Sequence, residues 1–185
     1  MFSIAIRSPA VDIDKIENEL NFFFRDDIKK IKNSLWGRLT TTEKVNLLNF
    51  QIIEIYYRFG DDFASATGSL SNQEYQQAIP LLLVAEQYAL LGLELLANNN
   101  LDDPLEIDLL VWVFRINYEL KNSKKGDTYQ KLAIEKAKRI YGENHSEVIR
   151  LYIIQYGMHS LVNLNEAILD IENASIISKR LNPND

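Results

Sequence analysis

The sequence contains no cysteine and only two histidines in 185 residues. The lack of cysteine excludes disulfide bonds, thiolate nucleophiles and cysteine-ligated zinc sites, and it is compatible with a reducing compartment. Neither His145 nor His159 has a second histidine or a carboxylate three or four residues away, which is the spacing of a helical metal site. The G-x-S-x-G motif and the Gly-Lys-Ser/Thr end of a phosphate loop are also absent. We therefore expect a non-catalytic protein without a metal or cofactor.

Long apolar runs and positive charge are also scarce. The chain has 26 acidic and 20 basic residues and a net charge of −6, so it lacks a general positive field that would attract nucleic acid. No window reaches about 18 uncharged apolar residues, and the apolar run before Arg7 is too short for the core of a signal peptide. These features predict a soluble cytoplasmic protein that binds neither nucleic acid nor membrane.

Proline and glycine are rare as well, with four and seven residues respectively, whereas 46% of the chain is hydrophobic. Apolar residues recur at three- and four-residue steps, which is the pattern of amphipathic helices, and no segment requires a β-strand. We predict an all-α chain of about seven helices with its longest loop at residues 60–72. The predicted helices cover residues 12–32, 40–59, 72–97, 103–121, the segment that ends at Tyr141, 146–160 and 165–181.

Several helix ends have recognisable signals. Thr40 with Glu43, and Ser71 with Glu74, have the spacing of a capping box. Asp103 followed by Pro104 is typical of a helix N-terminus. Gly142, in the segment "YGENHS", suits a helix C-terminus, while Asn144 and His145 can bond to backbone groups of the turn. We interpret this segment as a joint between helices and not as a catalytic loop.

Small residues recur in three of the predicted helices with a spacing of seven residues, which is two helical turns. Such positions lie on one face of each helix and allow another helix to approach closely. The pairs are Ala78 with Ala85, Gly126 with Ala133, and Ala167 with Ala174.

The segment "AIEKAKRIYGENHSEV", followed one helix later by "NEAILDIENASII", resembles the tetratricopeptide repeat of the kinesin light chain type. The resemblance implies an α-solenoid of about three antiparallel helix hairpins at residues 40–181, with an N-terminal capping helix at 1–35, in a single domain. The chain departs from the family pattern at Ser146, where proline is usual, and at Ile153 and Ile154, where a pair of asparagines is common. Ligand specificity is therefore not carried over from the family.

In this family the first helix of each hairpin lines a groove that binds peptides or protein surfaces. The resemblance places six candidate partner-binding residues in that groove: Asp108, Arg115, Tyr118, Tyr152, Tyr156 and His159. The predicted function is a protein-interaction module or adaptor. The alternatives are a secretion or folding chaperone, a peptide-responsive regulator, and an enzyme that uses the 60–72 loop. A further alternative is that these six residues are ordinary core or surface residues.

The C-terminal end of the predicted array lacks an obvious polar cap, because four isoleucines crowd its last helix. They are Ile168, Ile171, Ile176 and Ile177. Homo-oligomerisation through this C-terminal helix is therefore possible.

Overall fold

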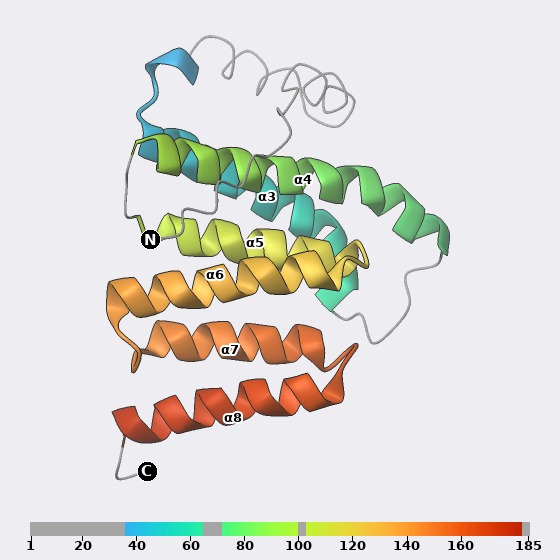
Figure 1. Ribbon diagram of the computed structural model, residues 1–185. Coiled ribbons are helices and arrows are strands. Elements are labelled where there is room, and N and C mark those ends of the chain that lie inside the picture. Colours follow the sequence, from blue (N-terminus) through green and yellow to red (C-terminus); the bar gives the residue numbers. More distant parts are fainter. Residues whose placement is uncertain (1–35, 65–71, 100–102, 183–185) are drawn as a thin grey trace. The chain divides into compact units, whose positions relative to one another are not determined.

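The computed structural model describes residues 36–64, 72–99 and 103–182 (Figure 1). In these ranges the protein is helical and contains no β-strand, which confirms the predicted all-α class. The predicted N-terminal helix and Ser71 of the second capping box lie outside the described residues. The elements are a 3-10 helix η1 (Trp36–Arg38) and six α-helices: α3 (Thr41–Ala64), α4 (Asn72–Asn98), α5 (Leu105–Glu119), α6 (Ser123–Tyr141), α7 (Ser146–His159) and α8 (Leu164–Leu181).

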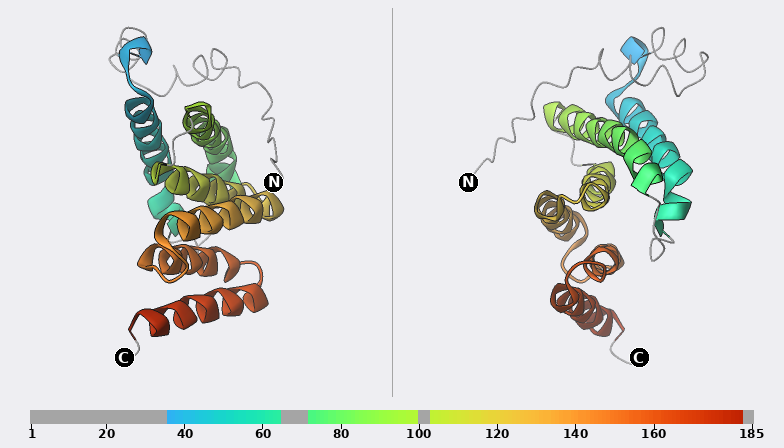
Figure 2. Two further views of the ribbon diagram at one scale, coloured as in Figure 1. Left: turned by 60° about the vertical axis from the view of Figure 1, so that its left-hand side comes forward. Right: turned by 90° about the vertical axis from the view of Figure 1, so that its right-hand side faces the viewer.

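The helices belong to two units, with the division between Asn99 and Asn100. In the first unit, α3 and α4 pack together as an antiparallel pair (Figure 1). In the second unit, α6 packs against α5 and α7, α7 packs against α8, and α5 makes a smaller contact with α7. Seen from its side, the second unit alternates between two layers, with α5 and α7 in one and α6 and α8 in the other (Figure 2). The three predicted antiparallel pairs are thus present, while a continuous solenoid through all three stays a prediction.

Helix α3 follows the predicted apolar stripe but is longer than expected. Its buried hydrophobic residues are Val45, Leu48, Ile52, Ile55 and Tyr56. We predicted that the helix ends at Gly60, whereas α3 continues to Ala64. A single glycine inside a helix costs only about 1 kcal/mol relative to alanine, so it does not by itself end a helix.

Helix α4 contains the most apolar segment of the described chain. Residues Ala78–Asn98 are long and apolar enough to cross a membrane, and half of this window is buried inside the structure. Core helices of soluble proteins meet the same criterion of length and composition. The segment therefore does not assign the protein to a membrane.

The start of α3 has the predicted capping box. The Thr40 amide donates to Oε2 of Glu43 at 2.8 Å, and the Glu43 amide donates to Oγ1 of Thr40 at 3.3 Å. These bonds from Thr40 lower the pKa of Glu43 below its ordinary value of 4.5. At the start of α5, Oδ1 of Asp103 accepts a bond of 2.9 Å from the Leu105 amide, as expected for an acidic cap. The predicted start at Thr40 is confirmed, and α5 begins at Leu105 with Pro104 as its N-cap, one residue later than predicted.

All the predicted small residues are buried. Ala78, Ala85, Ala133 and Ala167 are fully covered, Ala174 is 4% exposed, and Gly126 is also buried. A Cβ atom at Gly126 would lie 2.8 Å from Cδ2 of Tyr118 and 3.1 Å from the Phe114 carbonyl oxygen. The absence of a side chain therefore lets α6 approach α5 closely at this point.

The segment between α6 and α7 is a joint, as predicted. Gly142 has a φ of +92°, which favours glycine, and its amide donates to the Lys138 carbonyl at the end of α6. His145 is the N-cap of α7, and its Nδ1 accepts a bond of 3.1 Å from the Glu147 amide. The His145 ring also stacks on Tyr141, with 4.7 Å between the ring centroids. The Nδ1 atom and the ring face of His145 thus both make contacts within the turn.

Candidate functional site

The six candidate residues lie on α5 and α7, the two helices that share one layer of the second unit. They form two groups that differ in exposure. Tyr118 and His159 are buried, with exposed fractions of 7% and 2%. Asp108, Arg115 and Tyr152 are half-buried, and Tyr156 is 39% exposed. Only the second group can take part in a surface, so the prediction that Tyr118 and His159 face an open groove is corrected.

Four side chains of α5 recur at the spacing i, i+4, i+7 and i+11 and form its least buried stripe. This spacing places them on one side of the helix. The Arg115 guanidinium lies over the Trp112 ring, 5.3 Å from its centroid, so the middle of the stripe is a stacked aromatic-cation pair. Burial raises the pKa of Glu119, and the positive charges of Lys121 and Arg115 oppose this shift. The stripe consists of Asp108, Trp112, Arg115 and Glu119.

Arg150, which lies on α7, contacts this stripe of α5. Its Nη2 lies 3.1 Å from Oδ1 of Asp108, and its Nε donates to both carboxylate oxygens of Glu147 at 3.0 and 2.9 Å. Burial raises the pKa of Asp108, and the Arg150 charge opposes that shift. The Asp108 carboxylate is therefore engaged within the protein. Sequence reasoning selected Asp108 but missed Arg150, which pairs with it from α7.

The exposed side of α7 carries large apolar side chains. Ile153 is 50% exposed and Tyr156 is 39% exposed. Tyr152 differs from them because Lys138 of α6 lies over its ring, 6.0 Å from the centroid, so this tyrosine lies on the side of α7 toward α6. We define the α5/α7 face by the residues that remain accessible: Trp112, Arg115, Glu119, Ile153 and Tyr156.

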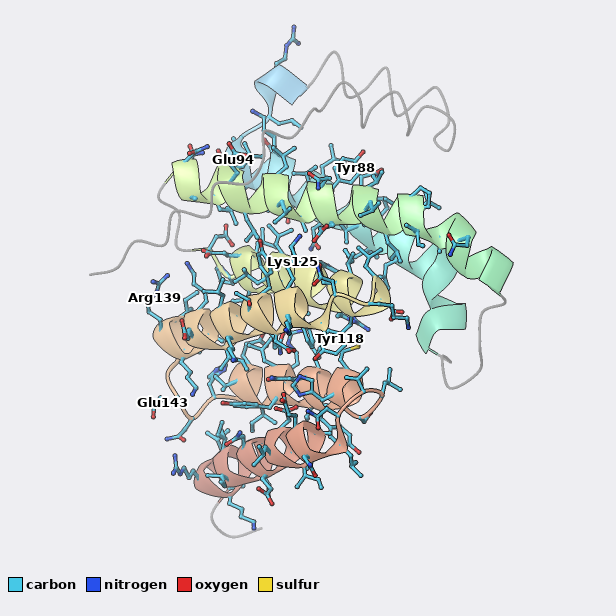
Figure 3. The ribbon with its side chains drawn as sticks, turned by 45° about the vertical axis from the view of Figure 1, so that its right-hand side comes forward. Tyr88, Glu94, Tyr118, Lys125, Arg139 and Glu143 are labelled. Atoms are coloured by element: carbon cyan, nitrogen blue, oxygen red, sulfur yellow. The ribbon has the colours of Figure 1, made fainter. Side chains whose placement is uncertain are left out.

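The second unit also contains a buried polar cluster with one residue from each of its four helices. His159 of α7 bridges two carboxylates, since Nδ1 lies 2.6 Å from Oδ2 of Asp170 on α8 and Nε2 lies 3.1 Å from Oδ1 of Asp127 on α6. The Tyr118 hydroxyl of α5, labelled in Figure 3, donates to the same Oδ1 of Asp127 at 2.5 Å. The four-helix polar cluster is therefore Tyr118, Asp127, His159 and Asp170.

Burial changes the pKa of two groups in this cluster. Burial raises the pKa of Asp170, and the His159 charge opposes the shift. Burial, followed by the bond to Asp127, raises the pKa of Tyr118 and keeps its phenol a neutral donor. The cluster thus joins two carboxyl groups, one imidazole and one phenol by hydrogen bonds.

The cluster is arranged for structure more than for chemistry. Both nitrogens of His159 are engaged by carboxylates, and its side chain is only 3% exposed, so a substrate has no route to a ring nitrogen. Among the residues that the structure describes, no group of three or more His, Asp or Glu side chains has the geometry to hold a metal ion. What the cluster does is connect α5, α6, α7 and α8 through directional bonds.

Sequence reasoning missed Asp127 and Asp170, although one signal was present. Asp170 lies between Ala167 and Ala174 at three- and four-residue steps, so it shares the buried stripe of α8. A carboxylate on a buried stripe is rare unless it is paired, so this position predicts a buried cationic or donor partner. The sequence around Asp170 does not indicate which residue is this partner.

Comparisons of this chain with protein-family models, with curated proteins and with solved structures find no match. The resemblance to tetratricopeptide repeats therefore depends on the residues "AIEKAKRIYGENHSEV" and "NEAILDIENASII" and on the packing of small residues described above.

Proposed function

We propose that this chain is a non-catalytic protein-interaction module that binds a peptide or an extended protein segment on the α5/α7 face. The observations that carry the proposal are the exposure of Ile153 and Tyr156 on α7 and the stacked Trp112 and Arg115 on the least buried stripe of α5. Aromatic and arginine side chains contribute a large share of the energy at protein interfaces. Together these residues offer apolar area and hydrogen-bonding groups.

The support under this face is preorganised. Arg150 bonds to Asp108 across α5 and α7, and the four-helix polar cluster connects the same two helices to α6 and α8. Because the buried cluster orders the four helices before a partner arrives, little conformational entropy is lost from the backbone on binding, whereas the exposed Arg150–Asp108 pair adds little. This favours recognition of a flexible peptide by a surface of fixed shape.

The chemistry of the face indicates the kind of segment that fits. An apolar or aromatic side chain of the partner would pack against Ile153 and Tyr156, and a carboxylate would accept charge-assisted hydrogen bonds from Arg115. Glu119 already interacts electrostatically with Arg115, so a partner carboxylate would compete with it. Added salt should therefore weaken binding of an acidic peptide more than binding of a neutral one.

The experiment begins with capture of partners from the source cell by the immobilised chain, followed by calorimetric titration of the peptide that binds. Tyr156→Ala and Ile153→Ala should each cost about 1 to 2 kcal/mol of binding free energy, because each truncation removes side-chain area that the wild type would bury against the partner. Phe50→Ala is the matched control, since Phe50 is 55% exposed but lies on α3. Circular dichroism checks that each variant remains folded. Full affinity of both α7 variants would place the binding surface elsewhere and contradict the proposal.

A further inference from the structure

Helices α6 and α8 lie in the same layer of the second unit, and their buried residues correspond at a constant offset of 41 positions (Figure 2). The matched pairs of buried residues are Gly126 with Ala167, Tyr129 with Asp170, Ala133 with Ala174, and Lys136 with Ile177. On α6 this side faces α5, since a Cβ atom at Gly126 would meet the Tyr118 ring. On α8 it faces α7, since Asp170 bonds to His159. Each helix thus packs against the preceding one through the same positions.

Helix α6 has a second buried side, which packs against α7. Nε2 of Gln130 donates to the Leu151 carbonyl of α7 at 2.8 Å, and Oδ1 of Asp127 lies 3.1 Å from Nε2 of His159. Two further buried residues follow Gln130 by four and seven positions, so they share this side of the helix. The α7-facing side of α6 therefore consists of Asp127, Gln130, Ile134 and Ala137.

The corresponding side of α8 is exposed. The residues at the offset of 41 positions are Ile168, Ile171, Ser175 and Ser178, and all four are accessible. Ile168 is 46% exposed and Ile171 is 42% exposed, while Leu164, one turn before Ile168, is 67% exposed. We call these five residues the open α8 face. On α6 the equivalent side receives the following helix, whereas on α8 no described helix of the second unit covers it.

We propose that the open α8 face binds one amphipathic helix of a partner protein, which packs against α8 as α7 packs against α6. Helix α7 runs antiparallel to α6, so the partner helix should run antiparallel to α8 (Figure 1). From Leu164 to Ser178 the face extends about 21 Å, which a helix of about 15 residues covers. This surface is separate from the α5/α7 face, and the proposal does not depend on a peptide binding there.

The first half of the open α8 face indicates an apolar partner. On α6, the polar side chains of Asp127 and Gln130 bond to α7. On α8 their places are taken by Ile168 and Ile171. A polar side chain of the partner would lose its bonds to water there without gaining new ones. The partner helix therefore needs apolar side chains opposite both isoleucines.

The second half of the face favours a helix over other apolar partners. Ser175 and Ser178 are small, so a helix can approach closely and place large side chains over them. Lipid acyl chains would leave the two hydroxyls without hydrogen-bond partners. At the edge of the α6/α7 contact, Lys138 lies over the Tyr152 ring, and its counterpart on α8 is Lys179. An aromatic or acidic side chain of the partner would match Lys179 in the same way.

The probe for this site is a synthetic peptide with the α7 sequence, residues 146–160, that carries Gln155→Leu and His159→Leu. His159 contacts Asp127 on α6, and Gln155 precedes it by one turn on the same side of α7. Leucines at these two positions would therefore meet the isoleucines of the open α8 face. Because short peptides are marginal helices in water, a covalent staple joins the exposed positions 153 and 157.

Fluorescence anisotropy measures binding of the labelled peptide to the purified full chain. We expect saturable binding with a dissociation constant below about 1 mM, and binding at least about tenfold weaker for the stapled peptide that keeps Gln155 and His159. Ile171→Glu in the protein should also weaken binding at least about tenfold. Ile176→Glu is the matched control and should leave binding unchanged, since Ile176 is 49% exposed on the same helix but corresponds to the exposed Glu135 of α6. Circular dichroism confirms that both variants fold.

The proposal is overturned if the leucine peptide does not bind saturably, if Ile171→Glu leaves its affinity intact, or if Ile176→Glu weakens it equally. Two measurements on the full chain without peptide test other occupants of the face. Sedimentation equilibrium would reveal a dimer, and sedimentation with phosphatidylcholine vesicles would reveal lipid binding. Either association, if Ile171→Glu abolishes it and Ile176→Glu does not, would assign the face to a second copy or to a membrane and overturn the proposal.

Discussion

Replacing Gly126 by alanine would add a methyl group at the closest approach of α6 to α5. The new Cβ would lie 2.8 Å from Cδ2 and 3.0 Å from Cε2 of the Tyr118 ring, and 3.1 Å from the Phe114 carbonyl oxygen. Ordinary contacts of a Cβ atom begin near 3.4 Å. The Tyr118 ring must therefore move, and its hydroxyl donates the 2.5 Å bond to Asp127 that connects α5 to the polar cluster.

Two effects of opposite sign determine the size of the change. Overpacking of a filled site costs about 1 to 3 kcal/mol, while replacing glycine inside a helix by alanine gains about 0.5 to 1 kcal/mol. The expected result for Gly126→Ala is a net loss of roughly 0.5 to 2 kcal/mol. Gly157→Ala is the matched control because Gly157 also lies inside a helix and a Cβ there meets nothing within 4 Å. It should instead gain about 0.5 to 1 kcal/mol.

The assay is urea unfolding followed by far-ultraviolet circular dichroism. With a slope of about 2 kcal/mol per molar urea, a difference of about 1.5 kcal/mol between the two variants separates their midpoints by roughly 0.7 M. The expected order of midpoints is Gly157→Ala above the wild type and Gly126→Ala below it. If Gly126→Ala is stabilised as much as Gly157→Ala, then position 126 has room for a methyl group. The conclusion that a small residue is needed there for α6 to pack against α5 would then be wrong.

Three further predictions concern the polar cluster, the small-residue stripe and the capping box. His159→Leu should destabilise the chain by about 3 kcal/mol, because Asp170 and Asp127 lose their shared partner, whereas Asp170→Asn should cost less; urea unfolding of both variants tests this. Ala167→Leu should cost about 1 to 3 kcal/mol by overpacking α8, and an unchanged unfolding midpoint would show that this position is not tightly packed. The pKa of Glu43 is lowered by Thr40, so its ionised form stabilises the start of α3 above pH 4.5, and this contribution is lost as pH falls through the lowered pKa. The difference in stability between the wild type and Glu43→Gln should therefore narrow on acidification, and a difference that is constant with pH would contradict this assignment.

Much of the local structure was predictable because its causes are local. The helix starts at Thr40 and Asp103 depend on side-chain oxygens that reach amides two or three residues away, and the end of α6 depends on the freedom of Gly142. The buried small residues follow from a spacing of seven within one helix. Predictions failed where the local signal was weaker, as at Gly60, which α3 passes through.

The candidate surface was predicted only in part. Tyr156 and Arg115 are accessible as expected, whereas Tyr118 and His159 are interior. A seven-residue step separates Tyr152 from His159, but the neighbouring helices cover the two positions to different degrees. The side of α7 that faces α6 and α8 is set by how those helices pack and not by the sequence of α7.

The polar cluster shows most clearly what the sequence alone determined and what only the tertiary structure decided. Hydrophobic periodicity and capping residues were sufficient to predict the helices, because these depend on interactions between residues a few positions apart, whereas the helix pairs were expected from the resemblance to a repeat family. The pairing of His159 with Asp127 and Asp170 connects residues 32 and 11 positions away. No local preference specifies such partners; they meet because the packing of α6, α7 and α8 shields these groups from water and leaves each polar group in need of a hydrogen-bond partner.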